Sequence, residues 1–281
     1  MVMENYSNWI GKKEVLDDYS DHRPVAMMQA LLNEENKLPA DLPHLYHWFY
    51  FLPLVNGQDL ALDGHPKKGG FLPPIPFPKR MWAGSRLEFI KPIAAHQSIC
   101  RESEILKVEF KHGKSGDMYF VTVQHSIYAE NELAIIEEQD IVYRDVSNQV
   151  QRAPQKQPEN AETKAFDYKK SFPIDPVTLF RYSAVTFNGH RIHYDRPYAT
   201  QEEGYPGLVV HGPLLATLLI HHFKQEYPDK QITHFEFRAV NPVFDFDDFQ
   251  IYGSIKSTQG ELWIQKDNGQ ICMKAKISFK E

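Results

Sequence analysis

Cysteine and long hydrophobic runs are what this 281-residue sequence most lacks. Only Cys100 and Cys272 are present, which excludes a disulfide-rich secreted scaffold and favours small, buried thiols. No apolar run approaches the length of a membrane-spanning helix, and the first residues lack the apolar core of a signal peptide. We therefore expect a cytoplasmic protein with no membrane partner.

Positive charge is also scarce. Lysine and arginine number 31 against 37 acidic residues, a formal net charge of −6, whereas nucleic-acid binding requires a basic face. Glycine-rich phosphate-binding motifs are absent from the sequence, which argues against nucleotide hydrolysis and nicotinamide chemistry. The content of 42% hydrophobic and 24% charged residues is ordinary for a globular protein.

Two blocks of strand-like sequence follow one another along the chain. Each opens on a similar segment, Leu87-Glu88-Phe89 or Phe235-Glu236-Phe237, and continues with three longer candidates. The pattern indicates an internal duplication and an α+β fold, in which an antiparallel sheet follows a helix twice. Richness in β-branched and aromatic residues predicts strands over 87–90, 103–111, 118–129, 132–143, 233–240, 248–256, 261–266 and 271–279.

Helices are predicted in two places. Residues 1–33 contain capping aspartates and then good helix formers after Pro24. The second helix begins at Gly212-Pro213, where proline suits the first helical position. It runs through Leu214–Ile220, which is apolar on every side and therefore belongs in a core.

Two irregular segments separate these elements. Residues 148–165 are polar and unpatterned, which is typical of a linker, and they divide the chain into domains 1–147 and 166–281. Residues 64–80 are too rich in glycine and proline for regular structure. Lys67 and Arg80 in this loop either bind ligand phosphates or are solvated, and the sequence leaves both interpretations open.

The polar cluster Asn188–Asp195 is the candidate site, because it leads directly to the start of the buried helix. Free backbone N–H groups at a helix start suit developing negative charge. An imidazole base beside such an oxyanion pocket is the minimum equipment for chemistry on a carbonyl or thioester. Taken by itself, however, His193 is better explained as a structural histidine.

Residues 182–193, YSAVTFNGHRIH, resemble the hydratase-2 signature of MaoC-like hot-dog proteins, roughly aromatic-Ser-x-Leu-Ser/Thr-Gly-Asp-x-Asn-Pro-Leu-His. Residues 207–215 are similar to the start of that family's central helix. The segments FNGHRIHYDRPYA (187–199) and GGFLPPIPFPKRMWAG (69–84) are most similar to its double hot-dog subgroup. This subgroup contains type 2 hydroxyacyl-thioester dehydratases and mesaconyl-C4-CoA or itaconyl-CoA hydratases.

The resemblance covers nearly the whole chain and implies a double hot-dog fold, with two helices each wrapped by antiparallel strands. It further implies that the second hot dog is catalytic, whereas the first is degenerate and helps to form the acyl groove. His193 would be the general base, and Asn188 would position water and the thioester. The Gly212 N–H would bind the enolate oxygen.

The sequence departs from the signature at several positions. The family's aspartate falls on Asn188, the glycine before it on Phe187, and its Asn-Pro on His190-Arg191, while the final histidine is kept as His193. A carboxylate can share the work of the base and an amide cannot. Asn188 therefore indicates an altered mechanism.

Other residues near the cluster are candidates for substrate binding. Arg191 and Arg181 could pair with the carboxylate of a dicarboxylic acyl group, or form surface ion pairs. His211, beside the glycine of the oxyanion pocket, could line the site or pack. His190, His193 and Asp195 are residue types that bind zinc or iron, but the family uses no metal. We expect neither a metal nor a cofactor.

The sequence thus predicts reversible hydration of an enoyl thioester, or dehydration of a 3-hydroxyacyl thioester, carried by CoA or acyl carrier protein. The arginines and the subgroup wording favour a short dicarboxylic acyl group. A 3-hydroxyacyl dehydratase of fatty acid metabolism, a thioesterase and a non-catalytic acyl-thioester binding protein stay open as alternatives. A monomer and a homodimer also stay open.

Overall fold

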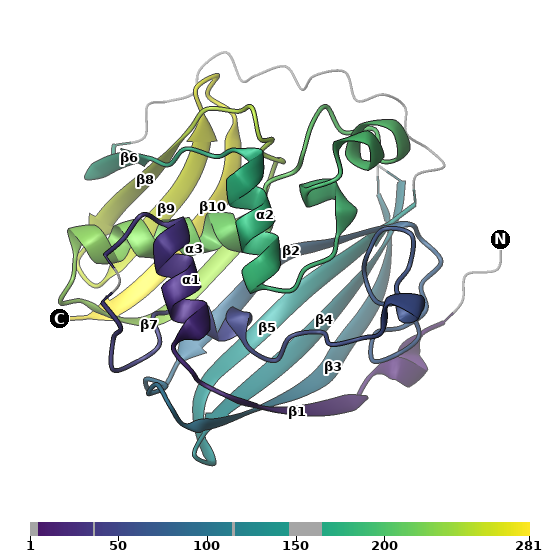
Figure 1. The fold of residues 1–281 in the computed structure, drawn as a ribbon, viewed down its shortest axis with the longest axis horizontal. Helices are drawn as coiled ribbons and strands as arrows, with labels where there is room; N and C mark the ends of the chain where they lie inside the picture. The colour runs from purple at the N-terminus through teal and green to yellow at the C-terminus, as the bar shows by residue number, and fades with distance from the viewer. Residues whose placement is uncertain (1–4, 36, 114–115, 146–164) are drawn as a thin grey trace.

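The part of the chain that the computed structural model describes forms one continuous antiparallel sheet (Figure 1). The described part of the chain comprises residues 5–35, 37–113, 116–145 and 165–281. Except for residue 165, the predicted linker 148–165 lies outside the described residues. The domain boundaries therefore stay a prediction.

The two blocks of strands have the same topology. The first five strands are β1 (Lys13–Tyr19), β2 (Lys79–Phe89), β3 (Ser98–Gly113), β4 (Gly116–Ala129) and β5 (Glu132–Arg144). The second five are β6 (Tyr168–Ser171), β7 (Gln231–Ala239), β8 (Phe249–Lys256), β9 (Gln259–Lys266) and β10 (Ile271–Lys280). The order in the sheet is β1-β3-β4-β5-β2-β7-β10-β9-β8-β6, which is a palindrome of corresponding strands. The predicted duplication is therefore present in the topology.

All eight predicted strands are present, and the residues explain why. Along β4 half-buried and buried residues alternate, as expected for a strand with one face on a core. The tight connection from β4 to β5 places Glu130 and Asn131 at positive φ, 50° and 65°. Two successive positive φ values are typical of the turn that matches the twist of a hairpin.

The prediction that residues 1–33 are helical was wrong for most of that range. Among residues 5–33, which the structure describes, the α-helix is α1 (Arg23–Leu31), whereas Lys13–Tyr19 forms β1 and pairs with β3 at the edge of the sheet. β1 is largely exposed, so its sequence lacks the apolar alternation of an inner strand. Pairing with β3, which no local signal reports, decides its conformation. The short edge strand β6 was missed for the same reason.

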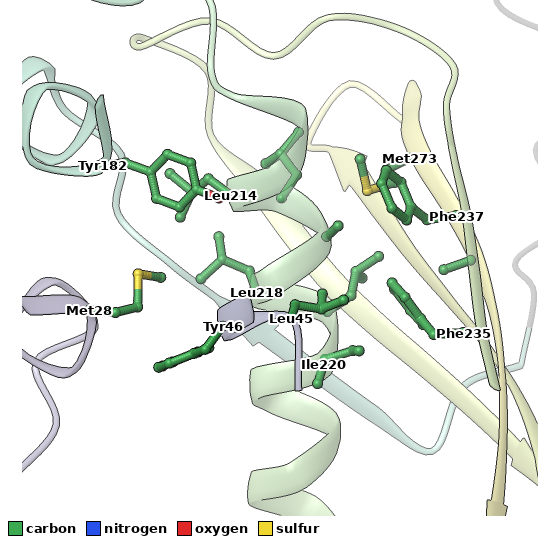
Figure 2. Packing of buried hydrophobic residues seen from close by; sticks show 14 of the residues in the cluster. Met28, Leu45, Tyr46, Tyr182, Leu214, Leu218, Ile220, Phe235, Phe237 and Met273 are labelled. Atoms are coloured by element: carbon green, nitrogen blue, oxygen red, sulfur yellow. The ribbon is translucent and has the colours of Figure 1, made fainter. Parts of the chain in front are cut away.

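The predicted buried helix is α3 (Gly212–Glu226), and it runs across the concave face of the second half of the sheet (Figure 1). Figure 2 shows Phe235, Phe237 and Met273 from the sheet on one side of α3, with Met28 and Tyr182 on the other. No helix of the described residues is long and apolar enough to cross a membrane. Cys100 and Cys272 are both free.

A second helix at the site, α2 (Pro176–Val185), was not predicted. Its start follows a recognisable rule, because Asp175 accepts the Thr178 N–H (2.7 Å) and Pro176 occupies the first turn. The remaining short helices are the 3₁₀ turns η1 (Ser7–Trp9), η2 (Tyr46–Phe49), η3 (Gly57–Asp59) and η4 (Arg191–His193), and the π-helical turn η5 (Tyr198–Glu202).

The two halves join where β2 pairs with β7, with Gly84 opposite Arg238 and Leu87 opposite Phe235. This seam is tight at Gly84. A Cβ atom added there would lie 2.3 Å from the Phe237 carbonyl oxygen, a contact that real Cβ atoms do not make. The glycine is therefore required by the close approach of two backbones.

We predict that Gly84→Ala destabilises the protein by about 2 kcal/mol, because the backbone of the seam must shift to admit the methyl group. The matched control is Gly57→Ala, where an added Cβ meets nothing within 4 Å. Urea unfolding of both variants measures the difference. Equal midpoints for Gly84→Ala and the unsubstituted protein would contradict the tight seam.

Candidate active site

His193 is held in one orientation by the backbone. Its Nδ1 lies 2.7 Å from the Val209 carbonyl oxygen. A carbonyl can only accept, so Nδ1 carries the hydrogen and Nε2 of the neutral ring carries the free lone pair. The ring is also almost fully buried. This is the tautomer that a general base acting through Nε2 requires.

His211 places His193 at the start of α3. The two rings are stacked, with centroids 3.7 Å apart and an interplanar angle of 18°. His211 is the N-cap residue of α3, and its Nε2 lies 2.8 Å from Ser183 Oγ of α2. The helix begins its hydrogen bonding with Leu215 N–H to His211 O (3.1 Å). The N–H groups before it, beginning with that of Gly212, are free to bind a ligand.

Asn188 uses its side-chain oxygen to shape the loop. Oδ1 accepts the His190 N–H (3.0 Å), and the Asn188 N–H donates to Ser183 O (2.8 Å). These bonds support the interpretation of Asn188 as a turn residue. They also leave its Nδ2 group as a donor, since no bond from Nδ2 to another described residue is found. A carboxylate at this position would have no such donor.

Burial keeps the imidazoles of the site neutral. It lowers the pKa of His193 to about 4, although the hydrogen bond to Val209 opposes this. Burial, with help from His193 and His190, holds the pKa of His211 well below its ordinary value. A neutral imidazole has a free lone pair at physiological pH, so His193 is ready to accept a proton.

The first half contributes residues that the sequence did not reveal. The ring of His65 lies 4.1 Å from that of His190, and the His190 and His193 rings are 5.4 Å apart. Asp63 is hydrogen-bonded to His65 (3.1 Å). The segment that contains Asp63 and His65 is distant from the site in sequence. Arg191 donates a hydrogen bond to the carbonyl oxygen of Leu62, which lies 129 positions earlier in the chain. No local pattern could have reported this contact.

The structure separates the predicted cationic residues into two groups. Arg191 donates from Nε (2.9 Å) and Nη2 (2.7 Å) to Asp195 Oδ2, and from Nη1 to Leu62 O (3.0 Å). Arg181 is exposed on α2, and Lys67 donates to Gln58 O (2.8 Å) in its own loop. These three side chains are solvated or already engaged within the protein.

Arg80 is placed differently, because it lines a cavity together with His190, Ile192 and Tyr205. Its charge is close enough to lower the pKa of both His65 and His190, each of which burial lowers more. No ion pair of Arg80 is found within the described ranges, whereas its neighbour Lys79 is paired with Glu203 (3.5 Å). Arg80 is therefore a cation on the wall of a small cavity beside His190.

The residues considered as metal ligands do not converge. Asp195 is paired with Arg191, and His193 is bonded through Nδ1 to the backbone. Among the described residues, the group with ligand atoms within 4.8 Å of one another is Asp63, His65 and His190. Within that group Asp63 and His65 share a hydrogen bond.

An aromatic wall stands beside the start of α3. The rings of Trp48 and Trp82 are 4.9 Å apart, and each lies 6.0 Å from Phe237. A Cβ added to Gly212 would lie 3.9 Å from the Trp82 carbonyl oxygen. The start of α3 is thus bordered by β2 of the first half.

The family model for hydroxyacyl-thioester dehydratase type 2 matches residues 45–245. The chain is 42% identical to a mesaconyl-C(4)-CoA hydratase of Chloroflexus aurantiacus over 282 residues, which covers 99% of each protein.

Solved structures confirm the α+β double hot-dog fold. HtdX of Mycobacterium tuberculosis is similar with a TM-score of 0.66 at 16% identity, over 95% of this chain and 100% of that one. A conserved hypothetical protein of the same organism, described as having a double hotdog fold, has a TM-score of 0.57 at 12% identity over 98% of both chains.

The buried neutral imidazoles predict how stability depends on pH. A histidine whose pKa in the folded protein lies below the unfolded value of 6.5 binds protons more tightly in the unfolded chain. Stability is then constant above pH 6.5 and falls as the pH drops toward the folded value. For His193, with a folded pKa of about 4, the loss is on the order of 3 kcal/mol.

Urea unfolding of the protein and of His193→Asn, each between pH 7 and pH 4, tests this. The variant lacks the titrating ring and keeps a donor for Val209, so its stability should fall less steeply below pH 6.5. Parallel curves for the two proteins would contradict a buried, neutral His193.

Proposed function

The chain belongs to the hydroxyacyl-thioester dehydratase type 2 family, and from this we propose that its substrate is a short dicarboxylic enoyl-CoA of the mesaconyl-C4-CoA type. It is a hydro-lyase, which adds water reversibly to an enoyl thioester or removes it from a 3-hydroxyacyl thioester. The observation that supports the site assignment is the bond from His193 Nδ1 to Val209 O (2.7 Å), which leaves Nε2 as the base.

The thioester carbonyl would lie at the start of α3. There the Gly212 N–H donates to the carbonyl oxygen, and the helix dipole favours the negative charge that develops on it. His211, the N-cap of that helix, is stacked on His193. The base and the oxyanion pocket are therefore fixed relative to one another by a single residue.

Water would be held between His193 and Asn188. The Nδ2 group of Asn188 donates to the water oxygen, while His193 Nε2 accepts one of its hydrogens. The oxygen attacks C3, and the electrons of the double bond move to C2 and the thioester oxygen, where Gly212 stabilises the enolate. The proton on His193 then passes to C2. Protons and charge balance, and no cofactor enters.

Arg80 would recognise the free carboxylate of the acyl group. In mesaconyl-C4-CoA this carboxylate is attached to the carbon that water attacks, so its partner must lie near His193. Arg80 shares a cavity with His190, whose ring is 5.4 Å from that of His193. Burying a carboxylate is costly unless it is paired, and a guanidinium can pair with it through two hydrogen bonds. Arg191 is already engaged with Asp195.

The remaining assignments follow from the same picture. The first half would form the acyl groove through Trp48 and Trp82, which pack against Phe237 of the second half. We propose CoA as the carrier and the cytoplasm as the location, and a homodimer is compatible with the site. Itaconyl-CoA and longer 3-hydroxyacyl thioesters are alternative substrates within the family's chemistry.

We predict that His193→Ala loses at least about 100-fold in kcat for hydration, the usual contribution of a general base. Loss of the enoyl-thioester absorbance with mesaconyl-C4-CoA measures the rate. The control is His112→Ala, an imidazole that is 84% exposed. Wild-type turnover in a folded His193→Ala variant would rule out this base.

A second prediction concerns the carboxylate. Arg80→Met should lower kcat/KM for mesaconyl-C4-CoA by about 100-fold, which corresponds to loss of a charge-assisted hydrogen-bonded pair. Activity on crotonyl-CoA, which has no carboxylate, should change little. The matched control is Arg238→Met, an exposed arginine on β7. Equal losses on both substrates would show that Arg80 does not read the carboxylate.

A further inference from the structure

The loop of the second half that contains Asn188 and His193, residues 188–195, is the proposed catalytic loop. It contacts a tight turn of the first half, residues 61–65. We call this segment the docking turn. The Ala61 N–H donates to His65 O (2.8 Å) and closes it. The carbonyl oxygen of Asp63, at its centre, accepts the Arg191 N–H (2.8 Å). A backbone group of the catalytic loop is thereby satisfied by the other half of the molecule.

Two glycines bring the backbones into direct contact. A Cβ added to Gly64 would lie 1.8 Å from the Gly189 carbonyl oxygen, and one added to Gly189 would lie 2.7 Å from Gly64 O. Gly64 also has a positive φ of 88°, which side-chain-bearing residues rarely adopt. The docking turn therefore has a fixed position against Asn188–His190.

This fixed turn carries a carboxylate–imidazole pair. Asp63 Oδ1 accepts the backbone N–H of His65 (2.9 Å), and Oδ2 accepts the hydrogen on His65 Nδ1 (3.1 Å). Both side chains are mostly buried, with exposed fractions of 18% and 23%. Two bonds to one carboxylate leave the imidazole a single orientation.

The Asp63–His65 pair contacts the catalytic loop at His190. The rings of His65 and His190 are 4.1 Å apart and inclined at 40°. The ring of His190 stands edge-on to that of His193, at 5.4 Å and 89°. His190 also lines the cavity that contains Arg80. His190 therefore connects the docking turn, the general base and the cavity.

Burial lowers the pKa of His65 most, and the charges of Arg80 and Lys68 lower it further. Asp63 is the carboxylate that acts on His190, while Arg80 from β2 and the imidazoles of His65 and His193 oppose a proton there. His211 at the start of α3 is neutral, and the Lys79–Glu203 pair closes the far side of the cavity. Burial would raise the pKa of Asp63, but its bonds with His65 hold that pKa well below the ordinary value. Asp63 is therefore ionised at neutral pH.

We propose that Asp63 and His65 are positioning residues of the active site. They hold the ring of His190 beside His193, and they supply from the first half the negative charge that the catalytic loop lacks at Asn188. Deprotonating water leaves a cationic imidazolium on His193 in a buried site, and a carboxylate that lies beyond the rings of His65 and His190 lowers the energy of that state. This inference rests on the proposed function, because it takes His193 as the base.

The test is the pH profile of Asp63→Asn, which keeps the shape of the side chain and removes its charge. We expect kcat to fall about tenfold and the acid limb of the kcat profile to move to lower pH by about 0.5 unit or more. The direction follows because His193 becomes harder to protonate without the anion. His65→Asn should lower kcat without moving the limb to lower pH, since Asp63 keeps its charge.

Asp59→Asn is the matched control, an exposed carboxylate in the preceding turn η3. It should match the unsubstituted protein. An unchanged profile for a folded Asp63→Asn variant overturns the proposal. A lower kcat with an unmoved limb also overturns it, because a purely structural role would produce that result.

Imidazole NMR titration of the protein without substrate gives an independent readout. Asp63→Asn should lower the pKa of His65, since the hydrogen bond and the charge that favour its proton are gone. This shift, seen in a protein that hydrates no enoyl thioester, would support the pair and refute the proposed function. Loss of hydration on treatment with EDTA, restored by Zn²⁺, would instead make Asp63, His65 and His190 a metal site and overturn the pair.

Discussion

Pairing of β2 with β7 is the interaction on which the rest of the structure depends. Without it each half would end in a long open strand edge, which invites association with other chains. With it, ten strands share one sheet, and Trp82 of β2 borders the start of α3. The same seam allows the loop before β2 to reach the catalytic loop. The fold and the active site are therefore not separable, because both are assembled across the boundary between the halves.

Much of the fold could be predicted because local patterns of apolar and polar residues determine it. Inner strands alternate apolar and polar residues, and α3 is apolar all round and starts at Gly212-Pro213. Those patterns gave the strands and the central helix, and the similar openings of β2 and β7 gave the duplication. β1 could not be found in this way, since it is an exposed edge whose polar sequence suits a helix equally well. Its conformation is set by hydrogen bonds to β3, nearly ninety positions along the chain.

The residues of the proposed site divide in the same way. His193, Asn188 and Gly212 lie within one short stretch, and the family signature pointed to them. Their supports, Val209 and Ser183, lie in that stretch as well. Asp63 and His65 come from the other half, and a turn sequence alone does not state what it docks against. Side-chain direction was equally hidden. Lys67 and Arg80 belong to one basic segment of the sequence, yet of the two only Arg80 lines the cavity. Arg191 lies in the same polar cluster as His193, but its guanidinium is bonded to Asp195.

The contact between Gly64 and Gly189 also has a consequence for the order in which the two halves fold during biosynthesis. A ribosome completes the first half before it makes the catalytic loop, and domains generally fold in the order of synthesis. The docking turn can then serve as a finished template on which residues 188–193 take their shape as they emerge. A circular permutation that moved the second half to the front would reverse this order. The catalytic loop would then be synthesised before the docking turn that it contacts.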